Sequence, residues 1–483
     1  MLRSARRGPF PVLLAVVVAV LCAATTLVAL GSPASATVTT ITLTSAADTG
    51  PGTLRAAFTD ASTGGPADGT DVEIVIPAGL GTITLASTLA FDGGSGGAHA
   101  LTVTGSGTTI TGDDTFPLVV VTSTGTTTLD GLTLTRGNSA TVGGAIATAG
   151  SIVVAGSTFA DNTSVNLGGA INSQGAAVIT DSVFTGNEAT ADSGGGIWAT
   201  LSVTTTRSTF TGNITATYGA AVISGGPVTA TDSVFDANVA PQAAGAFAGN
   251  GVLTAVRSTF TNHHSYSGSA LYTGGDAVVV DSTFANNSAS GYGGAIAALS
   301  SVTATNSTFA DNTAASGAGA AILTYGPATV AYSTLTGNAT TDPGWVVQGA
   351  TIALFASVLE SPGDNTALCS TAATSSGYSV ADDSSCGLTG VGDVQSPTLD
   401  PLLGPLGDHG GPTPTRVPLL GSPLVGAIPN AACQTAPLGA GVVTDQRGVP
   451  RPTTPGGPCD IGAVQFVAPP PEPDPVPEPT FTG

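Results

Sequence analysis

The sequence predicts an all-β fold, a single-stranded parallel β-helix in which each turn of the solenoid, or rung, takes about 25 residues. Segments between glycines are rich in Val, Ile and Thr in alternation, and no apolar spacing typical of a helix runs through them. A fixed period means that one strand-forming unit stacks on copies of itself. Phenylalanines recur every 24 to 26 residues within variants of Ser-(Thr/Val)-Phe-x-x-Asn: Phe159, Phe184, Phe210, Phe235, Phe260, Phe284 and Phe309.

Residues 1–36 are expected to form a secretory signal. Arg3, Arg6 and Arg7 precede an apolar run from Val12 to Leu30, and Ala34-Ser-Ala36 follows as a small-residue cleavage site. The alternative is a membrane anchor, because the run is nearly long enough to span a bilayer. We favour removal, which leaves a mature chain with no transmembrane segment.

Residues 37–72 are expected to form an N-terminal cap. The stretch Leu54–Phe58 is the one short segment with a helical pattern. A bare solenoid end would expose a sheet edge and the apolar interior, so a cover is physically required. The segment from Asp48 to Phe58 also resembles the amino-terminal cap of secreted β-helix proteins, although Thr53 and Ala56 depart from its signature.

Residues 73–395 are expected to form the β-helix, and the phenylalanine register assigns its faces. The positions seven and five before each Phe are expected to point inward, and those six and four before it to face solvent. The position three before Phe forms a charged column that cannot enter an apolar core, so the chain must turn a corner there. The column alternates in sign over much of its length: Asp181, Arg207, Asp232, Arg257, Asp281 and Asn306.

A second corner is expected at the Asn three residues after each Phe. Asn tolerates a left-handed backbone, and stacked Asn amides can form hydrogen bonds from rung to rung. A structural role is therefore the simplest interpretation of this column: Asn162, Asn187, Asn213, Asn238, Asn287, Asn312 and Asn338.

Two recurring motifs resemble a known family. The Gly-Gly-Ala-Ile segments at 143–146, 168–171 and 293–296, together with Phe-x-x-Asn, resemble the repeats of polymorphic outer-membrane proteins. They are also similar to secreted β-helix proteins of the pectate-lyase-like superfamily. This resemblance implies a right-handed β-helix.

Four cysteines lie beyond the repeats: Cys369, Cys386, Cys433 and Cys459. In an exported chain they suggest two disulfides, for which three connectivities exist. The sequential pairing closes the shortest loops and is preferred. A zinc site is less favoured, because no Cys-x-x-Cys spacing occurs.

Residues 396–467 resemble the choice-of-anchor Q domain of exported bacterial proteins. The similarity rests on segments such as Asp400–Leu406, Asp408–Pro412, Thr444–Gly448 and Cys459–Ala463. It implies a C-terminal region associated with surface anchoring. Gln465 stands where the family tends to have Glu, which makes an acid-dependent role doubtful. Residues 468–483 form a proline-rich tail that is expected to be extended.

Charge limits the partners. The formal net charge is −21, and loss of the three signal arginines leaves 7 basic against 31 acidic residues, or about −24. Nucleic acid is therefore excluded as a partner. Calcium could be attracted by such acidity, but no calcium site is assignable and no cofactor is expected.

Candidate catalytic residues are few. Arg136, Arg207 and Arg257 are the repeats' basic residues, and the last two already belong to the charged column. The pairs Asp113-Asp114 and Asp382-Asp383 are interpreted as turns, because neighbours on a strand face opposite ways. His263-His264 replaces the Asn corner in one rung and is interpreted as a variant loop. We therefore expect no catalytic residue, no cofactor-binding residue and no metal ligand.

Two functional classes remain. The first is a non-enzymatic secreted or cell-surface protein, adhesin-like or a scaffold, whose partner is an extracellular polysaccharide or a cell-surface component. The alternative is a polysaccharide lyase or glycoside hydrolase acting on acidic glycans. A third hypothesis, ordering of water by the outward Thr face, is weakened by Val256, Val278 and Val280, which interrupt that face. The scarcity of paired acids favours the first class, and the chain is expected to be a monomer.

Overall fold

The computed structural model describes residues 37–467, except residues 66, 96, 364–365 and 434–440. The predicted signal (1–36) and the proline-rich tail (468–483) lie outside the described residues. The chain divides into two units, Met1–Val38 and Thr39–Gly483. The stack of strands described below is that of the second unit.

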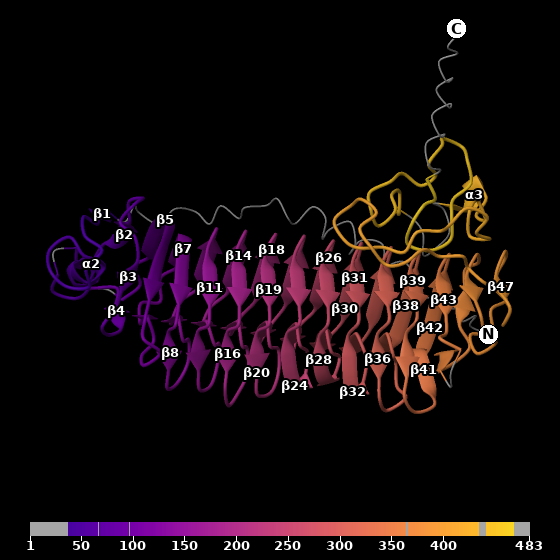
Figure 1. The fold of residues 1–483 in the computed structure, drawn as a ribbon, viewed down its shortest axis with the longest axis horizontal. Coiled ribbons are helices and arrows are strands. Elements are labelled where there is room, and N and C mark those ends of the chain that lie inside the picture. The colour runs from indigo at the N-terminus through magenta and orange to yellow at the C-terminus, as the bar shows by residue number, and fades with distance from the viewer. Residues whose placement is uncertain (1–36, 66, 96, 364–365, 434–440, 468–483) are drawn as a thin grey trace, which may run out of the picture. The chain divides into compact units, whose positions relative to one another are not determined.

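Parallel strands from successive rungs pair in three sheets, which confirms the predicted all-β parallel solenoid (Figure 1). In the regular rungs the chain passes twice through a large sheet, then through a nine-stranded and a twelve-stranded sheet. The large sheet contains β1 (Val38–Thr42), β2 (Asp71–Val75), β3 (Ile83–Thr84), β5 (Leu101–Thr111), β7 (Thr127–Thr135), β10 (Ile152–Ala155), β11 (Thr158–Ala160), β14 (Ala177–Thr180), β15 (Val183–Thr185), β18 (Val203–Thr206), β19 (Thr209–Thr211), β22 (Val228–Thr231), β23 (Val234–Asp236), β26 (Leu253–Val256), β27 (Thr259–Thr261), β30 (Ala277–Val280), β31 (Thr283–Ala285), β34 (Val302–Thr305), β35 (Thr308–Ala310), β38 (Pro327–Ala331), β39 (Thr334–Thr336), β42 (Thr351–Phe355), β43 (Val358–Glu360), β45 (Thr374–Ser375), β46 (Val380–Ala381) and β47 (Val394–Gln395).

The other two sheets complete each rung. The twelve-stranded sheet contains β4 (Leu89–Phe91), β6 (Val119–Val121), β9 (Ile146–Thr148), β13 (Ile171–Ser173), β17 (Ile197–Ala199), β21 (Val222–Ser224), β25 (Phe247–Gly249), β29 (Leu271–Thr273), β33 (Ile296–Ala298), β37 (Ile322–Thr324), β41 (Gly344–Gln348) and β44 (Thr366–Cys369). The nine-stranded sheet contains β8 (Asn138–Ser139), β12 (Thr163–Ser164), β16 (Glu188–Ala189), β20 (Ile214–Thr215), β24 (Val239–Ala243), β28 (His264–Ser267), β32 (Ser288–Tyr292), β36 (Thr313–Ala314) and β40 (Ala339–Thr340).

The first predicted corner separates the two large-sheet strands of each rung. Its residues adopt positive φ angles between 45° and 54°: Asp181, Arg207, Asp232, Arg257, Asp281 and Asn306. The next residue is a buried serine whose hydroxyl accepts the backbone N–H of the serine one rung earlier, as from Ser182 to Ser208 at 3.2 Å. The corner therefore points its charged side chain out and returns the chain to the interior, as predicted.

Phenylalanine rings fill the interior between the corners. Phe159 and Phe184 stack with centroids 4.7 Å apart and planes 4° apart, and the same stacking continues rung by rung to Phe309. The predicted alternation is also present, since Ala177 and Ile179 are buried while Val178 between them is 41% exposed.

The second corner differs from the prediction in one detail. The left-handed residue is the one before each Asn, for example Asp161 or Asn286, and the Asn itself turns inward. All seven asparagines of the column are fully buried. Their amides form the expected ladder, with Asn187 Nδ2 donating to Asn213 Oδ1 at 2.9 Å and to the carbonyl of Phe159 at 2.9 Å.

The predicted helix near the N-terminus is α2 (Leu54–Ala61). Thr53, a departure from the family signature, caps it by accepting the N–H of Ala56 at 3.2 Å. Arg55 forms an ion pair with Asp48 at 2.8 Å, and Leu54 and Phe58 are buried against the first rungs.

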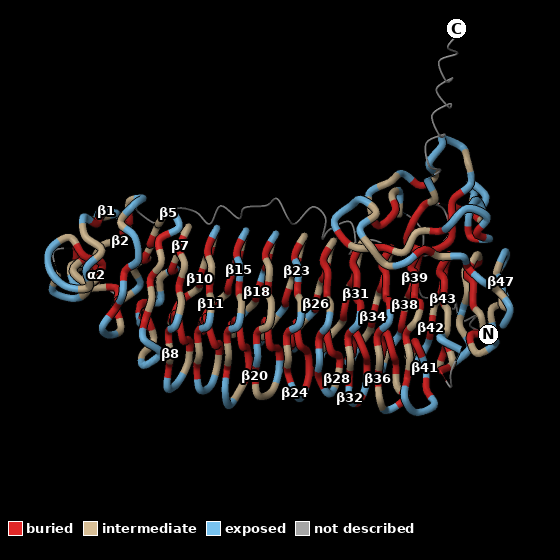
Figure 2. Tube along the Cα trace, in the orientation of Figure 1, coloured by how far each residue is buried: buried red, intermediate tan, exposed pale blue. Residues whose placement is uncertain are grey.

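The C-terminal region after β47 has little regular structure beyond isolated bridges and the short helix α3 (Asn430–Cys433). It packs on the large sheet, where its hydrogen bonds reach β31, β35 and β39. Its buried segments face this sheet (Figures 1 and 2). Gln446 joins two rungs, since its amide donates to Thr283 Oγ1 at 2.8 Å and accepts from Thr308 Oγ1 at 2.7 Å.

This packing corrects the expectation for the far end of the charged column. Asp281 was expected on the outer edge with the rest of the charged column, but the C-terminal region covers it and the next residue of the column, Asn306: Thr413 donates to the carbonyl of Asp281 at 3.2 Å, and Asn306 donates to that of Thr444 at 3.1 Å. Buried Arg451 donates to Asn306 Oδ1 at 3.0 Å and lies 4.5 Å above the ring of Tyr332. Burial raises the pKa of Asp281 to about 6.

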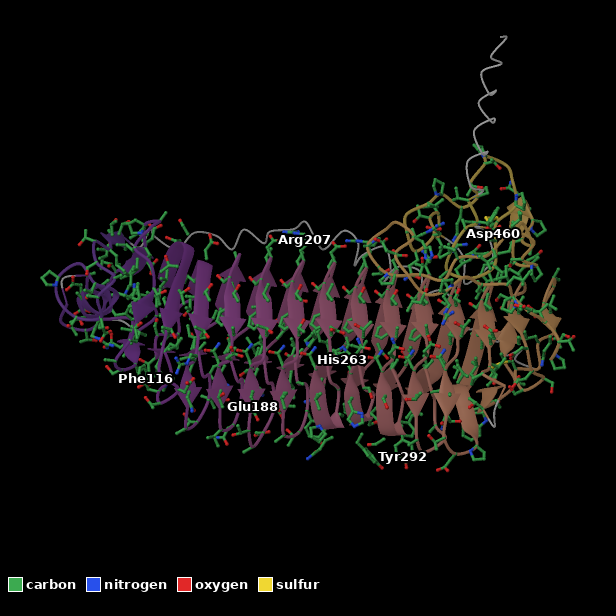
Figure 3. The ribbon with its side chains drawn as sticks, viewed as in Figure 1. Phe116, Glu188, Arg207, His263, Tyr292 and Asp460 are labelled. Atoms are coloured by element: carbon green, nitrogen blue, oxygen red, sulfur yellow. A yellow bond between two sulfur atoms is a disulfide. The ribbon has the colours of Figure 1, made fainter. Side chains whose placement is uncertain are left out.

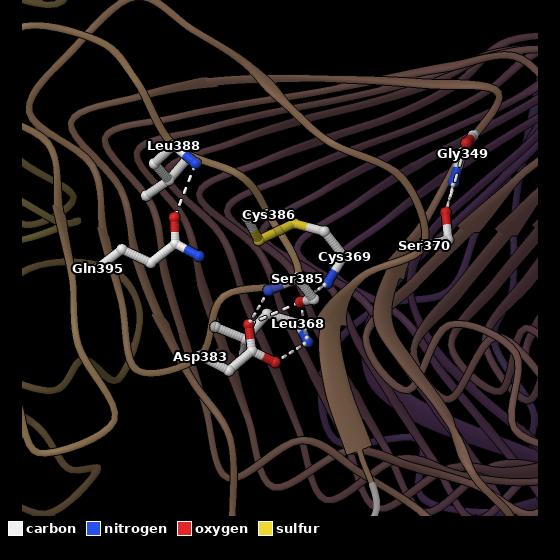
Figure 4. Close-up of a disulfide and its surroundings, with 9 residues drawn as sticks. All are labelled: Gly349, Leu368, Cys369, Ser370, Asp383, Ser385, Cys386, Leu388 and Gln395. Carbon is white, nitrogen blue, oxygen red and sulfur yellow. Dashed lines mark hydrogen bonds between the residues drawn. A yellow bond between two sulfur atoms is a disulfide. The ribbon is translucent and has the colours of Figure 1, made fainter.

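Two disulfides are present, Cys369–Cys386 with an S–S distance of 2.01 Å and Cys433–Cys459 with 2.05 Å. This is the sequential pairing. The first lies at the end of β44, beside Asp383 and Ser385, whose side chains accept N–H groups of the same strand (Figure 4). The second lies in the C-terminal region, where the carbonyl of Cys433 accepts the hydroxyl of Tyr332.

Candidate binding site

Three adjacent rungs depart from the repeat in the nine-stranded sheet. Strands β24, β28 and β32 have five, four and five residues, whereas the other six strands of this sheet have two. The pairing register shifts between Ala240 and Ala243 and again between Ser265 and Ser267. At each shift β24 and β32 have one residue more than β28 between the paired positions, which forms a bulge, and Tyr266 and Tyr292 lie in β28 and β32.

A shallow pocket with a volume of about 390 Å³ opens at this bulge. We call it the tyrosine pocket. Its walls are three tyrosines and four other uncharged residues: Tyr218, Tyr266, Tyr272, Pro241, Gln242, Ala243 and Ser267. The volume lies at the lower end of the range of roughly 300 to 1,000 Å³ that is usual for small-ligand sites.

The aromatic rings stand in two pairs. Tyr218 and Tyr272 have centroids 6.4 Å apart with planes inclined by 33°, and Tyr266 and Tyr292 are 5.8 Å apart and almost perpendicular. Tyr292, next to the pocket, projects from the lower edge of the ribbon (Figure 3). Tyr218, Tyr266 and Tyr292 are 39%, 47% and 39% exposed. Ring surface on this scale is open to a partner.

Small residues make room for the rings. Ala248 is the neighbour of Tyr272 in the twelve-stranded sheet, where the previous rung has Ile223. Gly291 lies against Tyr266, and a Cβ atom there would approach the ring to 2.8 Å. A larger residue at either place would compete with the aromatic rings for space.

The pocket's electrostatics are those of neutral polar groups. Hydrogen bonding to Tyr292 raises the pKa of Tyr266, so its hydroxyl stays protonated at neutral pH. Behind the wall, the carbonyl of Thr217 accepts the N–H of Gln242 at 3.1 Å, and the carboxylate of Asp192 accepts the hydroxyls of Ser193 at 2.9 Å and Thr217 at 3.4 Å. The pocket can therefore offer ring faces, hydroxyls and an amide to a ligand.

This site was not predicted from the sequence, although a compositional signal is present. All seven tyrosines lie between residues 218 and 378, and four of them lie between 218 and 292. The repeat register does not bring them together, because Tyr266 and Tyr272 stand six and twelve residues after Phe260, whereas Tyr218 and Tyr292 stand eight residues after Phe210 and Phe284, in rungs three apart. The bulges that do so are not visible in the period.

The three repeat arginines occupy structural pairs. Arg207 binds Asp181 at 2.7 Å, Arg257 binds Asp232 at 2.6 Å and Arg136 binds Asp114 at 2.6 Å. Each of the first two therefore pairs with the acid one rung earlier, on the outer edge that the register predicted. Figure 3 shows Arg207 at the upper edge of the ribbon.

The acidic pairs lie in bends, as expected. Asp114 has a φ of 66° and Asp113 accepts the hydroxyl of Thr115. Asp382 accepts the N–H of Ser361 and Asp383 that of Leu368, both at 2.9 Å. The structure thus places the two pairs at separate structural positions rather than in one site.

His263 corrects a prediction, because it does not belong to a variant loop. It takes the place of the Asn in the buried ladder, where its Nδ1 accepts the N–H of Asn238 at 3.2 Å (Figure 3). Burial lowers the pKa of His263 to about 4, so the ring is neutral at pH 7. Its neighbour His264 is exposed at the start of β28.

Within the described residues, no group of three or more His, Cys, Asp or Glu side chains is placed to hold a metal ion. None of the helices in that part of the chain is long and apolar enough to cross a membrane.

Residues 281–299 match the Chlamydia polymorphic membrane protein (Chlamydia_PMP) repeat. The matched segment runs from Asp281 at the first corner through Phe284 and Asn287 to the Gly-Gly-Ala-Ile motif, which is less than one period of this chain. Together with the parallel stack, it identifies a β-helix repeat protein. No curated protein and no solved structure matches the chain.

Proposed function

We propose that this chain is a non-enzymatic, adhesin-like binding protein that attaches to extracellular polymer or to cell-surface components. The observation that carries the proposal is the tyrosine pocket, in which exposed aromatic rings gather where three rungs depart from an otherwise regular stack. Exposed tyrosines are enriched at binding surfaces, because they bury a large area and offer a hydroxyl at small entropic cost.

The use already made of the charged groups supports binding rather than catalysis. Acid/base cleavage of a glycan needs carboxyl groups placed on either side of the scissile bond. Asp181, Asp232 and Asp114 are instead each committed to an arginine. The groups that line the tyrosine pocket are aromatic rings, hydroxyls and an amide, which suit the binding of a ligand.

Three observations support a place at the cell surface. The matched repeat comes from a family of membrane proteins. The N-terminal residues have the composition of a secretory signal, and the C-terminal residues resemble an anchoring domain. We therefore propose an exported protein with its binding pocket on the side of a β-helix.

The proposal is tested by co-sedimentation of the purified chain with insoluble polysaccharides and with whole cells. The same samples, with calcium and soluble pectin or alginate added, are assayed for new reducing ends and unsaturated products. We expect retention without cleavage. Cleavage that disappears when an outward aspartate is replaced would establish the enzyme instead.

A further inference from the structure

We propose that the tyrosine pocket binds an uncharged sugar unit of a polysaccharide, rather than the uronic acids of an acidic glycan. This inference rests on the proposed function and specifies its ligand class. Three features of the pocket carry it: the open ring faces, the absence of charge in its walls, and the commitment of the described arginines elsewhere.

The ring faces suit a sugar. A pyranose presents C–H groups on one side and hydroxyls around its rim, and the C–H side packs on the electron-rich face of an aromatic ring. Tyr218 and Tyr272 are tilted by only 33°, so they form two walls of one hollow rather than a packed edge-to-face pair. The volume of about 390 Å³ fits a short segment of a polysaccharide, whose sugar rings are bulky. An extended polyproline segment would need a longer track.

Polar groups in the walls match sugar hydroxyls. The amide of Gln242 and the hydroxyl of Ser267 can each donate or accept. Neutral donors and acceptors of this kind discriminate between ligands by leaving a buried group unpaired when the wrong ligand binds.

Charge argues against a uronate. None of the seven wall residues is charged, and the chain as a whole carries a formal charge of −21. A carboxylate would need a cation, and the arginines of the rungs are held by Asp114, Asp181 and Asp232. The hydrogen-bond network behind the wall contains the carboxylate of Asp192, which would repel an anionic ligand.

The test is calorimetric titration of the full chain with neutral oligosaccharides from glucan, mannan and galactan. Oligogalacturonate and oligoalginate of matched length are titrated in parallel. Two variants, Tyr266→Ala and Tyr272→Ala, remove pocket rings, and Tyr266→Phe keeps the ring without its hydroxyl. Tyr325→Ala is the matched control, because Tyr325 is 68% exposed and lies outside the pocket.

We expect at least one neutral oligosaccharide to bind, with affinity lowered about tenfold or more by either pocket alanine. Tyr266→Phe and Tyr325→Ala should each change the affinity by less than about threefold. Affinity should also be unchanged between about 50 mM and about 500 mM NaCl, since no ion pair is formed.

Other outcomes overturn the inference in distinguishable ways. Tyrosine-dependent binding of uronates, or of a proline-rich peptide added as a further probe, would refute the neutral-sugar class and leave the binding function standing. Polymer or cell binding that none of the pocket variants weakens would remove the pocket from the function. Lack of binding to every polymer and cell tested would contradict the proposed function itself.

Discussion

In each regular rung the buried asparagine amide forms two kinds of hydrogen bond with the backbone: it donates to a carbonyl and accepts an N–H. In the rung of Asn187, the side-chain Nδ2 donates to the carbonyl of Phe159 while the Oδ1 accepts the backbone N–H of Asn162 at 3.1 Å. Both backbone groups would otherwise be buried at a corner without a strand partner, which is costly. His263 interrupts this pattern, because its Nδ1 accepts one N–H but its Nε2 is buried without a partner among the described residues.

The variant His263→Asn should therefore stabilise the protein. An Asn at 263 can complete the ladder between Asn238 and Asn287, and we expect a gain of about 1 kcal/mol in the free energy of unfolding at pH 7. Chemical denaturation measures it. The exposed neighbour offers a control, since His264→Asn should leave the midpoint unchanged.

The same variant should change the pH dependence. The folded pKa of His263 is about 4, below the ordinary value of 6.5, so between these values the unfolded chain takes up a proton that the folded chain refuses. Stability contributed by the neutral ring is present above pH 6.5 and is lost as the pH falls towards 4, by up to about 3 kcal/mol. In His263→Asn this loss should be absent. An equal acid dependence in both proteins would show that His263 does not titrate in this way.

At the scale of the element, the phenylalanine column supports the large sheet from inside. Phe235 is fully buried, with the rings of Phe210 and Phe260 stacked at 4.8 Å and 5.0 Å and that of Phe247 edge-on at 4.4 Å. Its removal would open a hole in the middle of the stack that neighbouring rungs, fixed by their own hydrogen bonds, cannot close.

Phe235→Ala should lower the free energy of unfolding by about 3 to 5 kcal/mol, as a cavity mutation in a rigid core. Thr229→Ala, on the outward side of β22 in the same rung, should change it by less than about 0.5 kcal/mol. Thermal and urea melts of the two variants provide the comparison. A Phe235→Ala protein that melts like the wild type would disprove the inward assignment of the column.

The period of the sequence predicted the residue columns that recur in every rung, but not the features that occur only once. The Phe, Ser and charged columns follow from residue type at a fixed offset, because a charged side chain cannot enter an apolar interior. The extended strands β24, β28 and β32 break the register locally, so the tyrosine pocket could not be derived from the period. Nor could the docking of the C-terminal region, whose contacts join residues more than 130 positions apart, as from Thr283 to Pro414.

At the scale of the whole molecule, each rung contacts chiefly its two neighbours, as in other solenoids. Corresponding residues pair one rung apart, for example Ala155 with Thr180 and Thr180 with Thr206. A whole rung can therefore be removed without disturbing the others, provided that the deletion keeps the Ser, Phe and Asn columns in phase.

Deletion of residues 156–180 should test this modularity. It joins Ala155 to Asp181, removes one full rung and keeps the Ser, Phe and Asn columns in phase. We expect a folded protein with one cooperative transition and an intact tyrosine pocket, measured by circular dichroism and by ligand titration. Deletion of residues 156–168 removes half a rung and should prevent folding, because it places outward residues inside. Equal behaviour of the two deletions would contradict the modular description.

The docking of the C-terminal region also constrains the order in which the protein folds. Gln446 bridges Thr283 to Thr308, and Arg451 reaches Asn306, over separations of 138 to 163 residues. Neighbouring rungs close loops of only about 25 residues, which is faster and costs less entropy. The surface that receives Gln446 exists only after β31 and β35 have paired, so the C-terminal region, which follows the rungs in the sequence, can settle only on rungs that have already paired. Its docking thereby reports that the rungs beneath it have assembled in register.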